Sequence, residues 1–402
     1  MESNGSINSE SVIRFKLFDY LLAAYFFICP LEFAFNAVVP GGSTVKYLGA
    51  TIIILQLSYL YKYSLKMRVK AFHISMYLWI FIVFSSYFRT YSINYALIYM
   101  TSYINIVIFF ILLTIVNYNY MQVRLFINST LWGSTVSAII MLSGLNLYHG
   151  VGQRYTFNFL GAELDPNNAA AFLCYGVAIS LYNIFSSNNK NQVFGLIIFM
   201  INLIALFFTG SRGGFITISI VTVFILFDNF RATHIWHKNT IKKILGVTII
   251  FFVTALVLNY FVPEELLNRI FQIESYEGGS DRIIIWSYAF DKLLEKPLFG
   301  YGIGSFPEIA RAFFGTDHGV HNTYLMVLFE VGLIGFTFFL AFIANLAKIA
   351  VNKKNMLAVL LILVAIIPAI FLDALVKRFF WNGLILCYML IYNLDLSERN
   401  TS

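Results

Sequence analysis

The clearest sign of the fold class lies at residues 192–227, which read QVFGLIIFMINLIALFFTGSRGGFITISIVTVFILF. Two long, almost purely apolar runs flank the short turn TGSRGGF, residues 209–215. A helix that crosses a bilayer needs ~20 mainly apolar residues, whereas the strands of a transmembrane barrel are shorter and alternate in polarity. The continuous runs exclude a barrel and predict two membrane-spanning helices, joined by a turn that contains the cation Arg212.

The composition of the whole chain points the same way. Of its 402 residues, 59% are hydrophobic and 12% are charged, and the charged share is roughly half that of a soluble globular protein. The stretch MESNGSINSESVIRFKLFDY is polar for too long to be a cleavable signal peptide, and it leads into a full-length span. The 3 cysteines lie in apolar runs, so we expect packing residues and neither a disulfide nor a metal framework.

Apolar runs of this kind recur along the whole sequence. We therefore expect residues 1–402 to form one integral membrane domain, an all-α polytopic bundle of about twelve spans. The formal charge of +7 comes from basic residues scattered through short loops, which membrane orientation explains better than a nucleic-acid partner does. The expected spans are roughly 17–38, 45–63, 71–88, 95–116, 125–144, 168–185, 192–209, 214–230, 243–262, 323–347, 355–373 and 375–394.

The positions of the 27 basic residues orient the bundle. Cytoplasmic loops carry an excess of Lys and Arg, and the excess falls on the inner loops when both termini are placed in the cytoplasm. Three unusual polar stretches then face outward: residues 152–168, the turn TGSRGGF, and a long segment at 263–322 between the ninth and tenth spans. The sequence therefore predicts that the protein acts on the outer side of the membrane.

The long outer segment has a helical pattern of its own. Ser280 or Asp281 is expected to cap a helix that ends before Pro297. A second short helix is expected around PEIARAFF, and the segment is interpreted as a lid over the outer mouth of the bundle. An apolar stripe for packing on the membrane surface or on other spans is expected from Ile283, Trp286, Phe290 and Leu293.

Two arginines stand beside expected helix starts in these outer stretches. Arg212 precedes the span that begins near Phe215, and Arg282 is expected in the first turn of the long segment's helix. Helix N-termini attract anions, and a guanidinium offers a bidentate fork for phosphate oxygens. The pair predicts a phosphate or diphosphate clamp, with Gly210, Gly213 and Gly214 letting a ligand approach the backbone. The alternative is a pair of arginines that snorkel to lipid headgroups beside an ordinary tight turn.

A histidine opens the tenth span, in GVHNTYLMVLFEVGLIG. His321 is suited to take a proton near neutral pH, and the alternative is an interfacial or capping histidine beside Asn322. Glu330 lies about 13 Å further along a regular helix and on its opposite face, so we expect it to pair with a polar group on a neighbouring span. Other charged positions are interpreted as structural or capping: Asp373, Lys377, Arg378, Glu32 and the DPNN of residues 165–168.

Taken in order, these motifs resemble the O-antigen ligase/polymerase superfamily of bacterial membrane glycosyltransferases. The resemblance is carried by SRGG after an apolar span, by SDRIIIWSYAFDKLLEKPLFGYGIGSF and HNTYLMVLFEVGLIG, and by the loop QRYTFNFLGAELDPNNAAAF. It covers roughly residues 150–340. It implies a GT-C-like helix bundle that performs inverting glycosyl transfer on the outer face of the bacterial cytoplasmic (inner) membrane.

The resemblance also implies roles for particular residues. Arg212 and Arg282 would bind the diphosphate of an undecaprenyl-diphosphate-linked oligosaccharide donor, and His321 would assist the acceptor hydroxyl. Substrate-binding positions are expected at Arg154, Gly210, Ser211, Gly213 and Asn322. No metal or other cofactor is expected, because the first outer loop, VVPGGST, lacks the acidic residues that metal-dependent lipid-linked glycosyltransferases carry there. Expected partners are the lipid bilayer, the donor, an acceptor glycan, and the chain-length regulator and flippase of the same pathway.

Three readings of the function stay open at this point. A polymerase would join repeat units on the carrier lipid, and we favour it over a ligase that hands the glycan to a lipid A core. The product would be O-antigen, capsule or another glycan. A transporter or flippase for the same lipid-linked sugar would also need cations for the diphosphate, but it predicts broken helices at mid-membrane and paired repeats, and neither stands out in this sequence.

Overall fold

The computed structural model describes most of the chain. The described residues are 5–32, 44–63, 69–143, 146–148, 154–156, 158–159, 162–163, 165–186, 192–232, 245–246, 248–249 and 277–392. The span expected at 243–262 lies outside them, apart from the two short pieces near its start, and so does the first part of the long outer segment.

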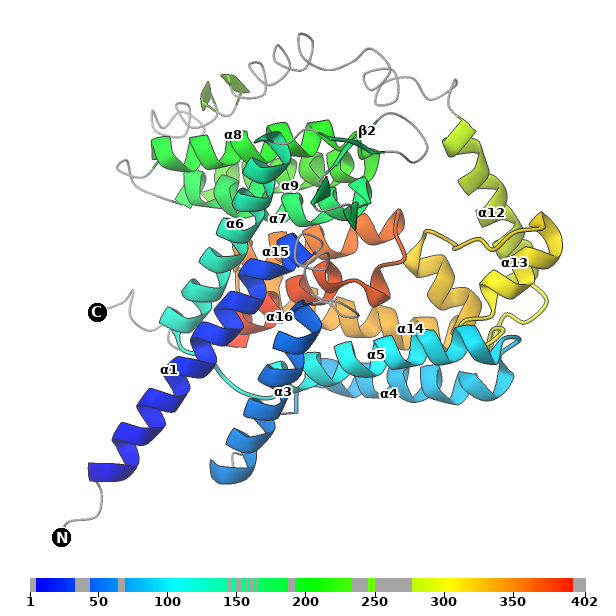
Figure 1. Ribbon diagram of the computed structural model, residues 1–402, viewed down its shortest axis with the longest axis horizontal. Helices are drawn as coiled ribbons and strands as arrows, with labels where there is room; N and C mark the ends of the chain where they lie inside the picture. Colours follow the sequence, from blue (N-terminus) through cyan, green and yellow to red (C-terminus); the bar gives the residue numbers. More distant parts are fainter. Residues whose placement is uncertain are drawn as a thin grey trace.

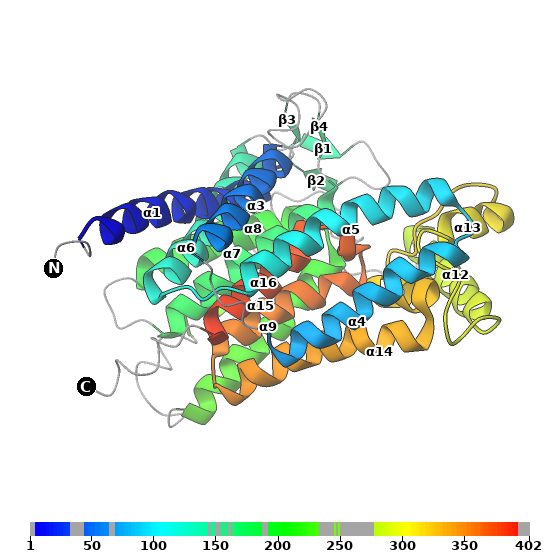
Figure 2. The same ribbon diagram turned by 90° about the horizontal axis from the view of Figure 1, so that it is seen from below.

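The described chain is built mainly from α-helices (Figures 1 and 2). The α-helices are α1 Gly5–Ile28, α3 Thr44–Tyr63, α4 Ala71–Ser85, α5 Ile93–Thr114, α6 Tyr120–Ser143, α7 Pro166–Ser186, α8 Gln192–Phe208, α9 Arg212–Ala232, α12 Glu277–Leu293, α13 Phe306–Phe314, α14 Thr323–Asn352, α15 Met356–Ile366 and α16 Arg378–Tyr392. Short 3-10 turns continue several of them: η1 Cys29–Leu31, η2 Ser86–Arg89, η3 Pro368–Ile370 and η4 Ala374–Val376.

Within the described residues, 6 helices are long and apolar enough to cross a membrane, and shorter apolar helices coincide with five more of the expected spans. The helical membrane-protein fold is thereby confirmed, while the total of about twelve spans stays a prediction. The order of the spans in space follows from their burial. In α7, 83% of the apolar window is buried inside the protein, against 28% in α9. Helix α7 therefore lies in the centre of the bundle, and α9 is far less buried among the other helices.

One outer loop is not helical. Two small antiparallel hairpins pair β1 (Asn146–Tyr148) with β2 (Arg154–Thr156) and β3 (Asn158–Phe159) with β4 (Ala162–Glu163). The sequence predicted only a loop here, because strands of two or three residues are too short to show an alternating pattern. The finding matters for the site, since β2 begins with Arg154.

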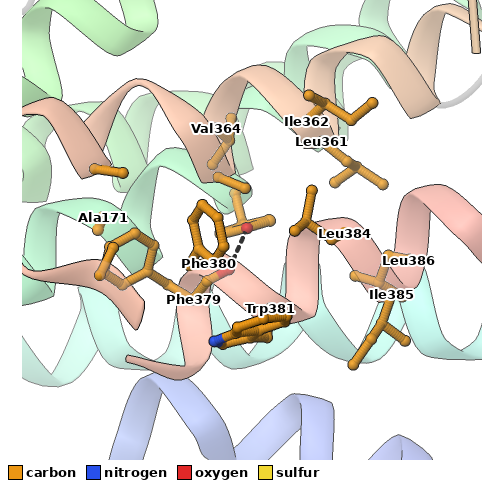
Figure 3. Close-up of a cluster of buried hydrophobic side chains, with 14 of the residues drawn as sticks. Ala171, Leu361, Ile362, Val364, Phe379, Phe380, Trp381, Leu384, Ile385 and Leu386 are labelled. Atoms are coloured by element: carbon orange, nitrogen blue, oxygen red, sulfur yellow. Dashed lines mark hydrogen bonds between the residues drawn. The ribbon is translucent and has the colours of Figure 1, made fainter. Parts of the chain in front are cut away.

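The C-terminal helices fill the middle of the bundle. Figure 3 shows Leu361, Ile362 and Val364 of α15 facing Phe380 and Leu384 of α16. The hydroxyl of Tyr175 on α7 donates to the carbonyl of Phe379 at 2.6 Å, which ties the start of α16 to the central helix. In Figure 1, α8 and α9 lie on one side of this central group and α4 and α5 on the other.

The long outer segment forms two helices at one end of the bundle, beside the end of α4 and the start of α5 (Figures 1 and 2). Helix α12 starts at Glu277, so Ser280 and Asp281 do not cap it, and Arg282 lies in its second turn and not in its first. Gly278 and Gly279 disfavour a helix, which makes a start after them the simpler expectation. The helix nevertheless includes both glycines. The second helix, expected around PEIARAFF, is confirmed as α13.

The inward face of α12 also differs from the expected stripe. Ile285, Ala289 and Leu293 are buried, whereas Ile283 and Phe290 are 67% and 52% exposed. Apolar residues occur on two sides of this helix, so its spacing allows more than one buried face. Packing against α14 selects the i, i+4, i+8 row of small and aliphatic side chains.

Helix α14 is interrupted at Gly332, which adopts φ 66° and ψ −172°. This backbone region is essentially restricted to glycine. A Cβ at this position would also lie 2.4 Å from the backbone C and O of Leu298, in the segment that follows α12. Gly332 therefore permits both the interruption and the close approach of that segment.

We expect Gly332→Ala to lower the free energy of unfolding by at least ~1–3 kcal/mol, from the forbidden dihedral angles alone, and the backbone clash adds to this. The measurement is thermal or denaturant unfolding of the purified protein in detergent. Gly315→Ala is the matched control, because Gly315 also has a positive φ (76°) but a Cβ there meets nothing within 4 Å. Equal losses in the two variants would show that the contact with Leu298 contributes nothing.

Candidate functional site

Four separate segments place charged groups within electrostatic reach of one another. Arg282 of α12 interacts with Arg212 at the start of α9, with Asp165 before α7, and with Asp373 between η3 and η4. Burial lowers the pKa of Arg282, the charge of Arg212 lowers it further, and the two carboxylates raise it. The structure therefore brings together the two arginines that the sequence singled out.

Neither arginine has an ion pair or a hydrogen bond within the described part of the chain. Both side chains are partly buried. Two like charges that lie near each other and are partly removed from water repel, and Asp165 and Asp373 do not fully offset the effect on Arg282, whose pKa stays lowered. An anion bound between the arginines would relieve this repulsion. The arrangement is therefore suited to bind an anionic group with several oxygens, such as a phosphate or diphosphate.

The turn before Arg212 is held by local hydrogen bonds. Gly210 adopts a left-handed conformation with φ 57°, and its N–H donates to Phe207 O at 2.9 Å. The hydroxyl of Thr209 donates to Leu206 O at 2.6 Å, and that of Ser211 donates to Asn167 Oδ1 at 3.1 Å. These contacts end α8 and start α9 within four residues, which fixes Arg212 at the helix N-terminus.

The side chain of Arg154 hydrogen-bonds to this turn and to the start of α7. This side chain is buried, with Nε donating to Thr209 O at 2.9 Å and Nη2 donating to Asn167 Oδ1 at 2.8 Å. Asn167 thus accepts from both Arg154 and Ser211. These bonds give Arg154 and Ser211 a role in positioning Arg212, while the direct substrate contacts expected of them stay predictions.

Gly213 and Gly214 allow α9 to pack closely. A Cβ at Gly213 would lie 2.8 Å from Cδ2 of Phe371, and one at Gly214 would lie 2.9 Å from Cδ1 of Leu206. Phe371 stands two residues before Asp373, so the approach at Gly213 sets the start of α9 against the turn that carries Asp373. The structure thus gives these glycines a packing reason, in addition to the expected one of admitting a ligand.

His321 stands two residues before the start of α14, next to the N-cap Asn322, with its side chain 49% exposed. It adopts a left-handed backbone conformation with φ 52°, which is uncommon for a residue other than glycine. Its Nδ1 lies 3.5 Å from Oδ2 of Asp373. Strained conformations that persist in a fold gather at functional sites, and an exposed imidazole beside a carboxylate is a common acid–base arrangement.

Asp373 is more buried than its partner, with 19% of its side chain exposed. Burial raises the pKa of Asp373, and the positive charges of His321, Lys377 and Arg282 partly offset that rise. Its Oδ1 has no hydrogen-bond partner among the described residues. One carboxylate oxygen therefore faces the histidine, and the other is left without a donor.

The turn that carries Asp373 is fixed to the start of α14. Thr323 Oγ1 donates to Leu372 O at 2.6 Å and accepts from Ala374 N at 2.7 Å. Sequence reasoning had interpreted Asp373 as structural, because the i, i+4 spacing to Lys377 sufficed to explain it. The signal that could have found it is an acid in a turn that the expected orientation puts on the same side of the membrane as His321.

Other predicted positions have the capping and structural roles that were named as alternatives. Asn322 is the N-cap of α14, accepting from Leu325 N at 3.0 Å, and Asp165 accepts from Asn167 N at 2.9 Å and caps α7 as expected. Arg378 forms a buried ion pair with Glu32, which agrees with their structural interpretation.

The prediction for Glu330 is wrong in one respect. Its carboxylate does have a partner, but this is the backbone N–H of Gly304, at 2.8 Å, and not a group on a neighbouring span. Sequence spacing could not reveal this contact, because the segment around Gly304 reaches α14 only through the break at Gly332.

Comparisons with known proteins bear on this site. Residues 195–340 match the model of a family described as O-antigen ligase. A protein of Haemophilus influenzae described as uncharacterized is 25% identical over 192 residues, an alignment that covers 42% of this chain and 46% of the relative. The chain thus matches less than half the length of that relative. The family match includes Arg212, Arg282 and His321, and Arg154 and Asp373 lie outside it.

Proposed function

We propose that this chain is a membrane glycosyltransferase, and the match of residues 195–340 to a family described as O-antigen ligase supports the proposal. Its reaction joins undecaprenyl-diphosphate-linked oligosaccharide repeat units into a longer glycan on the outer face of the bacterial cytoplasmic membrane. The observation that carries the proposal is the proximity of Arg212 and Arg282, two partly buried cations that form no ion pair or hydrogen bond within the described residues, beside the His321–Asp373 pair.

The arginines suit the leaving group of such a reaction. When the bond between the anomeric carbon and the diphosphate oxygen breaks, negative charge develops on the diphosphate. Fixed cations near that oxygen stabilise the transition state more than the ground state, which is the kind of interaction that accelerates a reaction. A pair of guanidinium groups also holds a diphosphate in a defined orientation, because each offers two parallel N–H donors.

The histidine suits the attacking group. In an inverting transfer the acceptor hydroxyl attacks the anomeric carbon from the face opposite the diphosphate, forming the new glycosidic bond while its proton passes to a base. Nε2 of His321 would take that proton. The Asp373 carboxylate, next to Nδ1, would hold the ring with its proton on Nδ1 and stabilise the imidazolium that forms.

Polymerase is the preferred form of this activity, and ligase is the second form. Both need a diphosphate site and a base, and they differ in the acceptor, which is another lipid-linked repeat unit or a lipid A core. Purified protein given only the lipid-linked repeat unit should form a ladder of longer lipid-linked glycans if it is a polymerase. Under a ligase, no product longer than the donor appears until a lipid A core acceptor is added.

Turnover in detergent also separates enzyme from transporter. A transporter moves the lipid-linked sugar between compartments, and detergent micelles provide no second compartment. Neither elongated nor transferred product, with the protein folded and both acceptors present, would overturn the proposed glycosyltransferase and leave the transporter.

We expect the reaction rate to change by less than about twofold when EDTA is added. Two arginines neutralise the departing diphosphate in this mechanism, so no divalent cation is needed as a Lewis acid. The measurement is initial rate with and without EDTA, with a metal-dependent glycosyltransferase run alongside to show that chelation was complete. Loss of activity that added Mg²⁺ or Mn²⁺ restores would refute the metal-independent mechanism.

A further inference from the structure

The segment that follows α12 hydrogen-bonds to backbone groups of α14 on both sides of its break. Tyr301 N donates to Phe329 O and Gly302 N donates to Glu330 O, both at 2.9 Å. From α14, Leu333 N donates to Pro297 O at 2.9 Å and Ile334 N donates to Leu298 O at 3.3 Å. In an unbroken helix the N–H groups of 333 and 334 would bond to the carbonyls of 329 and 330. Residues 297–302 therefore satisfy all four groups that the break leaves open.

We call this insertion of residues 297–304 into the break of α14 the splice. The side chain of Glu330 adds one more hydrogen bond to it. Its carboxylate is 3% exposed, and Oε1 accepts from the N–H of Gly304 at 2.8 Å. Glu330 thus binds the inserted segment twice, through its main-chain carbonyl to Gly302 and through its carboxylate to Gly304. Without the carboxylate, the buried N–H of Gly304 would lose its partner, which is unfavourable in a site that water does not reach.

The splice fixes one end of α12, and a second contact fixes its middle. Nε1 of Trp286 donates to the carbonyl of Val320 at 2.8 Å, one residue before His321. Arg282 precedes Trp286 by four residues and therefore lies on the same face of the helix. The segment just before α14 thus contacts α12 one turn after Arg282, and α14 itself holds the chain that follows the C-terminal end of α12.

We propose that Glu330 is a positioning residue, which sets the place of Arg282 relative to Arg212 through the splice of residues 297–304 into α14. Glu330 lies too far along α14 to orient His321. In this proposal it acts on the position of Arg282 instead. The effect on turnover rests on the proposed function of Arg282, whereas the effect on the position of α12 does not.

The test compares Glu330→Ala with Glu330→Gln. The amide oxygen of glutamine can accept from Gly304 N, whereas alanine leaves that N–H without a partner. We expect alanine to raise the KM for the lipid-linked donor about tenfold or more, to leave the KM for the acceptor within about twofold, and glutamine to restore most of the donor affinity. Thr337→Val is the matched control, since it removes one hydrogen bond within the same helix, to Leu333 O, and none of the hydrogen bonds between α14 and residues 297–304.

A second measurement reports the position of α12 without any activity. Spin labels on Ser287→Cys in α12 and Ile216→Cys in α9 give the distance between the two helices, and both positions are exposed. The native Cys29, Cys174 and Cys387 are all buried, so labelling falls on the introduced thiols. We expect the distance distribution to shift or broaden in Glu330→Ala and to match wild type in Glu330→Gln and Thr337→Val.

The two measurements separate the possible failures. An unchanged distance distribution in Glu330→Ala would overturn the positioning role, whatever happens to turnover. A shifted distribution with an unchanged donor KM would support the splice and count against the function proposed for Arg282. A uniform loss of folded protein in both Glu330 variants, with no rescue by glutamine, would show that the residue serves stability alone.

Discussion

Replacing Arg282 with alanine is expected to lower kcat by about 10²–10³-fold, and replacing Arg212 is expected to do the same. Removing one fixed donor from a site of developing negative charge has an effect of this size in enzymes that stabilise an oxyanion. Both guanidinium groups are partly buried and form no ion pair or hydrogen bond within the described residues, so neither holds the fold together through a direct polar contact. The loss should therefore appear in catalysis with little change in stability.

Lysine at either position refines this expectation. It keeps the charge but loses the bidentate fork, so Arg282→Lys and Arg212→Lys should retain more activity than the alanine variants and less than wild type. Removing both arginines should cost less than the product of the single losses, because they act on the same leaving group. The measurement is the initial rate of glycan elongation by purified protein at saturating donor.

The matched control for these variants is Arg124→Ala. Arg124 is an exposed arginine near the start of α6, so its removal changes the net charge equally without altering the site. Wild-type rates in both Arg212→Ala and Arg282→Ala would contradict the diphosphate clamp. They would favour the interpretation of the two residues as headgroup-seeking arginines.

The sequence predicted the helices of this fold well, because bilayer thickness sets a simple length rule. The span expected at 192–209 coincides with α8 to within one residue, and the span expected at 323–347 starts with α14, which continues to Asn352. The rule fails where the backbone departs from a regular helix. Nothing in the spacing of residues 323–352 predicts the break at Gly332, because an isolated glycine inside an apolar run is also compatible with an ordinary helix.

The same contrast holds for the site. Arg212 and Arg282 could be paired from the sequence, because a charge beside a helix start in an otherwise apolar chain is conspicuous and orientation placed both on one side. Asp373 and Thr323 could not, since their importance depends on a turn that meets the start of α14 from 50 residues further along the chain. Arg154 was selected for its charge, but its bonds to Thr209 and Asn167 become visible only when the loop is folded.

Replacing His321 with alanine is expected to lower kcat by about 10²–10⁴-fold, the usual contribution of a general base. Asp373→Asn should also lower it, because an amide cannot stabilise the imidazolium as a carboxylate does. The informative difference between these variants lies in the dependence of activity on pH. The active form needs His321 neutral and Asp373 ionised, so activity should fall as pH is lowered and the pair takes up protons.

The sign of the effect follows from the pKa of Asp373, which burial raises above the ordinary value of 3.8. Because protonation of a group with a raised pKa occurs at higher pH, Asp373 should contribute to the acid limb of kcat/KM within an accessible range. Protonation of Asp373 should therefore steepen the acid limb of log kcat/KM in the wild type. Asp373→Asn cannot take up this proton, so its acid limb should be shallower.

Lys377 gives an independent check on the same carboxylate. Its positive charge lowers the pKa of Asp373, so Lys377→Ala should raise that pKa further and move the acid limb of kcat/KM to higher pH. Lys377 makes no ion pair with Asp373 among the described residues, and its removal should leave the rate at the pH optimum within about twofold. An acid limb with the same slope in wild type and Asp373→Asn, and in the same place in Lys377→Ala, would show that Asp373 does not titrate in the reaction and that His321 acts without it.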